Sequence, residues 1–213
     1  MTPYDDVAEI VGAQLATPGG GGELTALTDA TLIAHGAFKG GTVSVMHDGI
    51  TYQYQVRCFD DLSRLPSRCG GFVDRAEVSV LWGGAVNMPR FDAATTARAT
   101  WQIRGLRGDH AWVTGTSMSW FDARFASGTS DERSILVQTF KDTAFAWNAS
   151  SMAVLGGSQS ADIKTVQEDA RPALTGVVTF DRADRVTLTL DDRIYWIDPT
   201  SGATTVATDG ELY

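Results

Sequence analysis

Apolar residues recur at helical spacing near the start of the chain. In residues 5–15 the apolar positions follow an i, i+3, i+4, i+8 pattern, which places their side chains on one helix face. These positions are Val7, Ile10, Val11 and Leu15. Four glycines at 19–22 interrupt the pattern, and helical spacing returns over 24–34 before Gly36. The sequence therefore predicts two short helices joined by a glycine turn.

After residue 40 the spacing changes to period-2 alternation of apolar and polar residues, with many β-branched and aromatic side chains. The Asp48-Gly49 pair predicts a tight hairpin. Beyond it, one strand face carries Ile50, Tyr52, Tyr54, Val56 and Cys58. We expect further strands over 76–82, 99–103, 112–120, 135–147, 152–155, 174–180, 186–190, 194–197 and 203–206. A polar connection is expected to begin at 156–158.

These elements predict a mainly β (α+β) fold. We expect a long antiparallel β-meander that forms a curved sheet, a barrel or a sandwich, with the two short helices packed against it. The alternation does not choose between these forms, because each needs the same pattern. No linker or change of composition divides the chain, so we expect one domain over 1–213, with a helical segment at 1–40 and an antiparallel β region at 41–213.

Charge excludes some partners. Among 213 residues, 17 Lys and Arg side chains stand against 26 Asp and Glu, a formal net charge of −9. This composition is opposite to that expected for a protein that binds nucleic acid or an anionic membrane through its overall charge. We also expect no transmembrane segment, because no run approaches the roughly 20 consecutive apolar residues that a membrane helix needs.

The two cysteines, Cys58 and Cys69, are too far apart for a CxxC redox or zinc pair. They are predicted to form a disulfide, with two free thiols as the alternative. A disulfide implies an oxidising compartment. We therefore expect an extracytoplasmic protein, secreted or periplasmic, with surface anchoring through a removed N-terminal signal as a variant.

Catalytic and metal-binding signals are weak. The histidines, His35, His47 and His110, are spread along the chain at predicted element ends, so we expect no shared metal site. Residues 115–119, Gly-Thr-Ser-Met-Ser, resemble the segment around the nucleophilic serine of subtilisin-type peptidases over four residues, but the rest of that family's pattern is missing. We expect Ser117 to lie on a strand whose small and polar residues face outward, and we expect no catalytic residues and no cofactor.

Aromatic residues provide the best candidates for a binding surface. The predicted ligand-binding set is Tyr52, Tyr54, Trp101, Trp112 and Trp196. Aromatic side chains on a sheet pack cores, and they also line apolar cavities and carbohydrate platforms. A subset is expected to converge where the helices meet the sheet, with an apolar or carbohydrate ligand.

The functional expectation is a non-enzymatic, exported bacterial binding or structural module. Two alternatives stay open. One is a carrier that holds an apolar small ligand in a helix-covered half-barrel, and the other is a hydrolase whose acidic or histidine site is assembled in space. A filled core would favour the binding or structural module. A dry aromatic cavity would favour the carrier, and a pocket with converging Asp, Glu or His side chains would favour the hydrolase.

Overall fold

The protein was analysed as a computed structural model. The structure describes residues 3–16, 21–36, 41–60, 67–125, 131–147, 152–166, 174–182 and 184–207, with only the backbone described over 131–147 and 152–166. Two helices come first, α1 (Pro3–Leu15) and α2 (Glu23–His35). Both helices predicted from the apolar spacing are therefore confirmed, and Gly36 caps the second through its backbone N–H, which donates to the carbonyl of Leu32.

The remaining elements are strands of one sheet, in chain order from β1 to β11. Their bounds are β1 (Thr42–His47), β2 (Ile50–Phe59), β3 (Arg75–Asn87), β4 (Phe91–Arg104), β5 (His110–Phe125), β6 (Asp131–Trp147), β7 (Met152–Val166), β8 (Leu174–Arg182), β9 (Arg185–Leu190), β10 (Arg193–Ile197) and β11 (Thr204–Val206). Each pair of neighbours is antiparallel. The predicted mainly β fold with an antiparallel meander is confirmed, and β1 and β11 lie at the two ends of the strand order.

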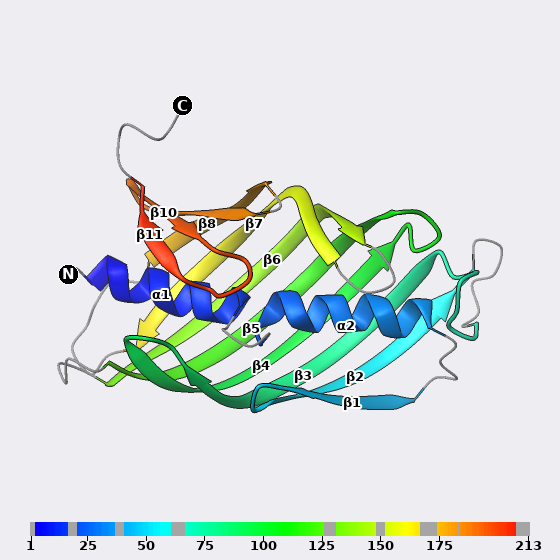
Figure 1. The fold of residues 1–213 in the computed structure, drawn as a ribbon, viewed down its shortest axis with the longest axis horizontal. Coiled ribbons are helices and arrows are strands. Elements are labelled where there is room, and N and C mark those ends of the chain that lie inside the picture. Colours follow the sequence, from blue (N-terminus) through cyan, green and yellow to red (C-terminus); the bar gives the residue numbers. More distant parts are fainter. Residues whose placement is uncertain are drawn as a thin grey trace.

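The sheet curves around the two helices, which lie end to end along it (Figure 1). Helix α1 packs against β5, β6, β9 and β11, whereas α2 packs against β2 and β3. We call the helix-covered side of the sheet the inner face and the opposite side the outer face. The predicted packing of both helices against the sheet is therefore confirmed.

Strict alternation explains how the strands form two different faces. On β2, every second residue from Ile50 to Cys58 is buried and the residues between them are exposed. The same alternation runs along β4. Because successive side chains of a strand point to opposite faces, the apolar set fills the space beneath the helices and the polar set covers the outer face.

Cys58 at the end of β2 forms the predicted disulfide with Cys69, and the two Cα atoms are 5.2 Å apart. The bridge joins the inner face of the sheet to the connection that leads into β3. The same connection contacts α2, because the backbone N–H of Gly70 donates to the carbonyl of Ala34 over 3.1 Å. One covalent bond and one hydrogen bond thus join strand, loop and helix at this end of the molecule.

One predicted boundary is wrong. The polar residues 156–158 do not begin a connection, because β7 runs without a break from Met152 to Val166. The strand pairs with β6 on one side and with β8 on the other, with an irregular register near Gly156. Backbone hydrogen bonds to two neighbouring strands stabilise a strand whatever side chains it carries. Glycine and serine at these positions therefore did not mark the end of β7.

Candidate functional site

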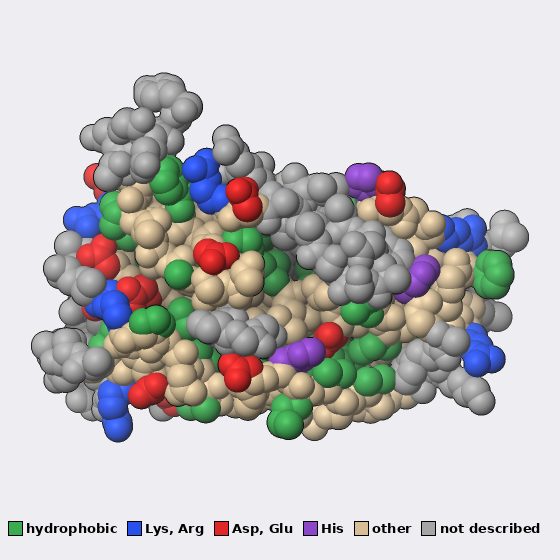
Figure 2. Space-filling view, viewed as in Figure 1, with side chains coloured by type: hydrophobic (Ala, Val, Ile, Leu, Met, Phe, Trp, Pro, Cys, Tyr) green, Lys and Arg blue, Asp and Glu red, His purple; other side chains and the backbone are tan. Residues whose placement is uncertain are grey.

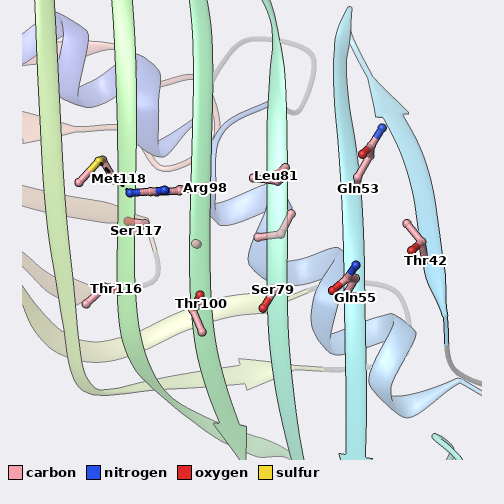
Figure 3. Close-up of a pocket in the computed structure, with 12 residues that line it drawn as sticks. Thr42, Gln53, Gln55, Ser79, Leu81, Arg98, Thr100, Thr116, Ser117 and Met118 are labelled. Carbon is pink, nitrogen blue, oxygen red and sulfur yellow. Dashed lines mark hydrogen bonds between the residues drawn. The ribbon is translucent and has the colours of Figure 1, made fainter.

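A groove on the outer face crosses the first five strands. Its volume is about 480 Å³. Most of its lining side chains are hydrogen-bonding groups that project from the side away from the helices, which lie behind the sheet in Figure 3. These are Thr42, Gln53, Gln55, Ser79, Arg98, Thr100 and Thr116, with Leu81 and Met118 as the apolar members.

A second hollow of about 490 Å³ continues this groove along the strands. The two share Gln55, Ser79 and Thr100, and the second adds Arg57 and Glu77 at its far part. We call the two together the outer groove. Side-chain amides and hydroxyls are the most numerous functional groups in it, and each such group both donates and accepts hydrogen bonds.

The strands hold these side chains in fixed register. Gln55 pairs with Ser79, Ser79 with Thr100 and Thr100 with Thr116, so one row of four polar residues crosses β2 to β5. A β-bulge follows between β5 and β6, where the register shifts between Val113 and Gly115. The row therefore rests on a ladder of backbone hydrogen bonds rather than on loops.

Arg98 forms the cationic edge of the groove. Its guanidinium lies over the Trp120 ring, 5.7 Å from the centroid, and its Nη2 donates to Sδ of Met118 over 3.8 Å. A guanidinium stacked on an aromatic ring is held in place while its outer N–H groups stay available. Arg98, Met118 and Trp120 thus form a compact platform beside the polar row.

Three of the predicted ligand residues lie together on the inner face, within the core. Tyr52 and Tyr54 stack with centroids 6.1 Å apart, and Trp82 connects Tyr52 to Trp101. Both phenols contact the helices: the Tyr52 hydroxyl donates to the carbonyl of Gly22 over 3.2 Å, and that of Tyr54 donates to Asp29 over 3.0 Å. Burial raises the pKa of both tyrosines above the usual range, so they are neutral donors that attach α2 to the sheet.

Trp112 and Trp196 are not part of this cluster. Trp112 is 46% exposed, and Trp196 lies partly exposed under the guanidinium of Arg185, 4.5 Å from its centroid. Trp112 does not belong to the subset that converges at the helices, because the inward positions of β5 beside it are Ala111 and Val113, its immediate neighbours. Alternation in this strand indicates two faces, and large residues occupy both: Trp112 lies on the outer one, whereas Phe121 and Phe125 face inward.

Ser117 is also placed opposite to expectation. Its side chain points inward and is 2% exposed, like that of Ser119. It lies close enough to Glu23 to lower the pKa of that carboxyl, but burial dominates and raises the pKa to about 8. Neither serine hydroxyl and neither Glu23 oxygen makes a hydrogen bond of good geometry among the residues that the structure describes.

The described part of the chain contains no assembled metal-binding or histidine site. No group of three or more His, Cys, Asp or Glu side chains lies there within reach of one ion. His47 instead contacts Asp29, with Nε2 and Oδ2 2.8 Å apart, and His110 contacts Asp109. His35 is the last residue of α2. Each histidine thus lies at an element end, as predicted.

The outer groove contains residues that the sequence reasoning missed. Gln53, Gln55, Ser79 and Thr100 are the polar half of strands that were recognised by their apolar half. A polar residue on the open face of a sheet gives the same sequence signal whether or not the face binds a ligand. The available sequence signal was that Gln, Ser and Thr occupy these positions, although charged residues are common on the exposed face of a sheet.

No family model, curated protein or solved structure matches this chain. Among the described residues, no helix is long and apolar enough to cross a membrane.

Proposed function

We propose that the protein is a non-enzymatic binding module that holds a neutral, linear oligosaccharide in the outer groove. The observation that supports this most is the row of amide and hydroxyl side chains across β2 to β5, at Gln55, Ser79, Thr100 and Thr116. Sugar hydroxyls need partners that donate and accept, and these groups do both. The extension of the groove along the strands suits a chain rather than a single compact molecule.

The position of the groove on a sheet face supports a glycan over an extended peptide. Peptides that bind sheets usually add a strand at an edge, where backbone N–H and C=O groups are free. Here the backbone of β2 to β5 is already paired on both sides, and the edges lie at β1 and β11. The ligand must therefore be recognised by side chains, and these are mostly uncharged.

The arrangement gives less support to the two alternatives. A carrier of an apolar ligand needs space beneath the helices, and that inner face is occupied by buried side chains, including Tyr52, Tyr54 and Trp101. A hydrolase with paired carboxylates needs two acids at the groove. Glu77 is the carboxylate among the described lining residues, and it pairs in register with Arg57.

Export is a further part of the proposal. The Cys58–Cys69 disulfide supports it, because disulfides persist in oxidising compartments. Glycans are abundant outside the cytoplasm, where an exported binding module would meet them.

Titration with neutral hexasaccharides tests the function. Backbone amide shifts of the ¹⁵N-labelled protein are followed with β-1,4-linked and α-1,4-linked glucose hexasaccharides. We expect saturable shifts confined to β2–β5 with at least one of them. Gln55→Ala and Thr100→Val should each weaken binding by about threefold to tenfold, the cost of one hydrogen bond.

Thr189→Ala is the matched control, because Thr189 is an outward-facing threonine of β9, far along the strand order from the groove. It should leave the dissociation constant unchanged. Shifts centred on the helices, or equal losses in Thr100→Val and Thr189→Ala, would contradict the proposal. So would the absence of shifts with both sugars.

A further inference from the structure

One aromatic side chain projects from the connection between β2 and β3. Phe72 is 87% exposed, more than any other large hydrophobic residue that the structure describes. Its neighbours differ sharply from it, because Val73 and Cys69 are buried. Covering a large apolar side chain that is exposed to water lowers the free energy, so Phe72 is a candidate contact point for a partner when its surroundings also favour one.

The backbone beneath Phe72 is firmly held. The N–H of Val73 donates to the carbonyl of Gly70 over 2.9 Å, which closes a tight turn around residues 71 and 72. The guanidinium of Arg107 donates twice to the carbonyl of Phe72, from Nε at 2.9 Å and from Nη2 at 2.7 Å. With the disulfide at Cys69, these contacts present the ring on a rigid base.

Exposed arginines lie at the same end of the molecule as this aromatic ring. Arg107 lies in the turn between β4 and β5, Arg104 ends β4, and Arg68 precedes the bridged cysteine. All three are exposed, whereas Asp109 is the exposed acid of the same turn and forms a hydrogen bond with His110. Asp60 and Asp74, both partly buried, are further acids in the described part of this connection. Among the exposed side chains that the structure describes here, the charge is net positive, on a chain whose formal charge is −9.

A second aromatic residue lies at the same end. Trp112 is 46% exposed, and its ring lies directly above Gly105, because a Cβ added to this glycine would be 2.5 Å from the Trp112 ring. In the space-filling view, a hydrophobic side chain projects at the end of the molecule beyond α2, with basic side chains on either side (Figure 2). Acidic side chains are scattered elsewhere over that face rather than gathered there.

We propose that this end of the molecule docks on an anionic lipid surface, with the Phe72 ring inserted among the lipids and Arg68, Arg104 and Arg107 facing the phosphates. Aromatic rings favour the membrane interface, and each basic side chain near an anionic surface adds attraction. The overall negative charge orients the molecule, because it is repelled by the surface while the arginine-bearing end is drawn to it.

A lipid surface fits this end better than a protein partner. Protein interfaces usually have a central apolar cluster surrounded by a polar rim. Here Phe72 projects as a single ring, Trp112 at the same end is only about half as exposed, and the exposed arginines lie in neighbouring segments, which suits a layered medium with acyl chains below the charged phosphates. The outer groove is a separate surface, so this inference goes beyond the proposed glycan binding.

Vesicle flotation tests the proposal. The probes are vesicles of phosphatidylcholine alone and of phosphatidylcholine with a quarter phosphatidylglycerol. Wild-type protein should float with the anionic vesicles, and Phe72→Ser should lower the partition constant by about tenfold or more. Arg68→Gln with Arg104→Gln should weaken binding and reduce its dependence on salt.

Met46→Ser is the matched control, because Met46 is 72% exposed and lies near the start of β2, at the opposite end of that strand from the disulfide. It should bind as the wild type does. The proposal is overturned if the wild-type protein does not float with the anionic vesicles or if Phe72→Ser floats as well as the wild type. It is also overturned if Met46→Ser lowers the partition constant as much as Phe72→Ser does.

A gain-of-signal variant keeps the test independent of folding. Phe72→Trp should bind anionic vesicles as the wild type does, and its additional fluorescence should shift to the blue and be quenched by lipids brominated on their acyl chains. If Phe72→Trp floats with the vesicles but its fluorescence neither shifts nor is quenched, the ring at position 72 does not insert among the lipids and the proposal is overturned.

Discussion

At the scale of single residues, Glu23 stands out as a buried acid that has no ion pair with the residues that the structure describes. It is the first residue of α2 and is fully buried, and burial raises the pKa of its carboxyl to about 8. Among the residues that the structure describes, Ser117 included, none makes a hydrogen bond of good geometry with either carboxyl oxygen of Glu23. At neutral pH the group is therefore mainly a protonated acid, which costs less to bury than a carboxylate.

This carboxyl makes stability fall as the pH rises. Between pH 4.5 and about 8 the folded state keeps a proton that the unfolded state releases, so the free energy of unfolding decreases across that window. The decrease is at most about 5 kcal/mol by linkage. Glu23→Gln should remove this slope and be more stable than wild type at pH 8, as measured by urea unfolding from pH 4 to 9.

Glu9→Gln is the control, because Glu9 lies in α1 as an ion-pair partner of Arg90 and should not remove the Glu23 slope. An identical pH profile for wild type and Glu23→Gln would show that the carboxyl of Glu23 is hydrated and ionises normally.

At the scale of secondary-structure elements, the end of β2 connects a strand, a loop and a helix. Cys58 is bridged to Cys69, the N–H of Ser67 donates to the carbonyl of Cys58 over 2.7 Å, and Gly70 donates to the end of α2. The disulfide closes a short loop, so its main expected effect is to restrict the unfolded chain.

Reduction should lower the free energy of unfolding by about 3 kcal/mol in the chain-entropy model. The measurement is the urea midpoint with and without a phosphine reductant. The double variant Cys58→Ala, Cys69→Ala should match the reduced wild type and be insensitive to reductant. Reaction of two thiols with a thiol reagent in the unreduced native protein would show instead that the bridge does not form.

The same scale shows how far the sequence could predict the structure. Period-2 spacing gave the strands and the Asp48-Gly49 hairpin because the apolar half of each strand must be buried. Spacing does not say which half is inside when both contain large or polar residues, and this is why Ser117 was placed on the wrong face. The outer groove depends on the curvature of the sheet and on the register between strands. The pattern of apolar and polar residues in a single strand predicts neither.

At the scale of the whole molecule, the two faces of the sheet perform different tasks. The inner face holds the helices through buried aromatic residues and polar contacts at its rim. On α1 these contacts include the hydrogen bonds from Tyr195 to Asp5 and from Tyr4 to Asp191, each 2.9 Å long, and the ion pairs of Arg90 with Asp6 and Glu9. The outer face contains the groove, and most of the side chains that line it project from the side of the sheet opposite to α1.

Arg90→Ala should therefore loosen α1 without affecting the outer groove. The pairs that it removes are partly exposed, so a loss of about 1 kcal/mol is expected. Hydrogen exchange of α1 amides should accelerate by about fivefold while amides of β3 and β4 keep their protection. The apolar dye anilinonaphthalene sulfonate should fluoresce with Arg90→Ala but not with wild type, because the inner face is uncovered only when α1 detaches.

Arg98→Ala provides the reciprocal control, because Arg98 lies on the outer face in the groove. It should weaken oligosaccharide binding while α1 exchanges as in the wild type, whereas Arg90→Ala should bind sugar normally. Saturable dye binding by the wild-type protein at one site would favour the apolar carrier, since a ligand would then enter beneath helices that open without any mutation. If both variants lose sugar binding and α1 protection together, the two faces form one cooperative unit and are not independent.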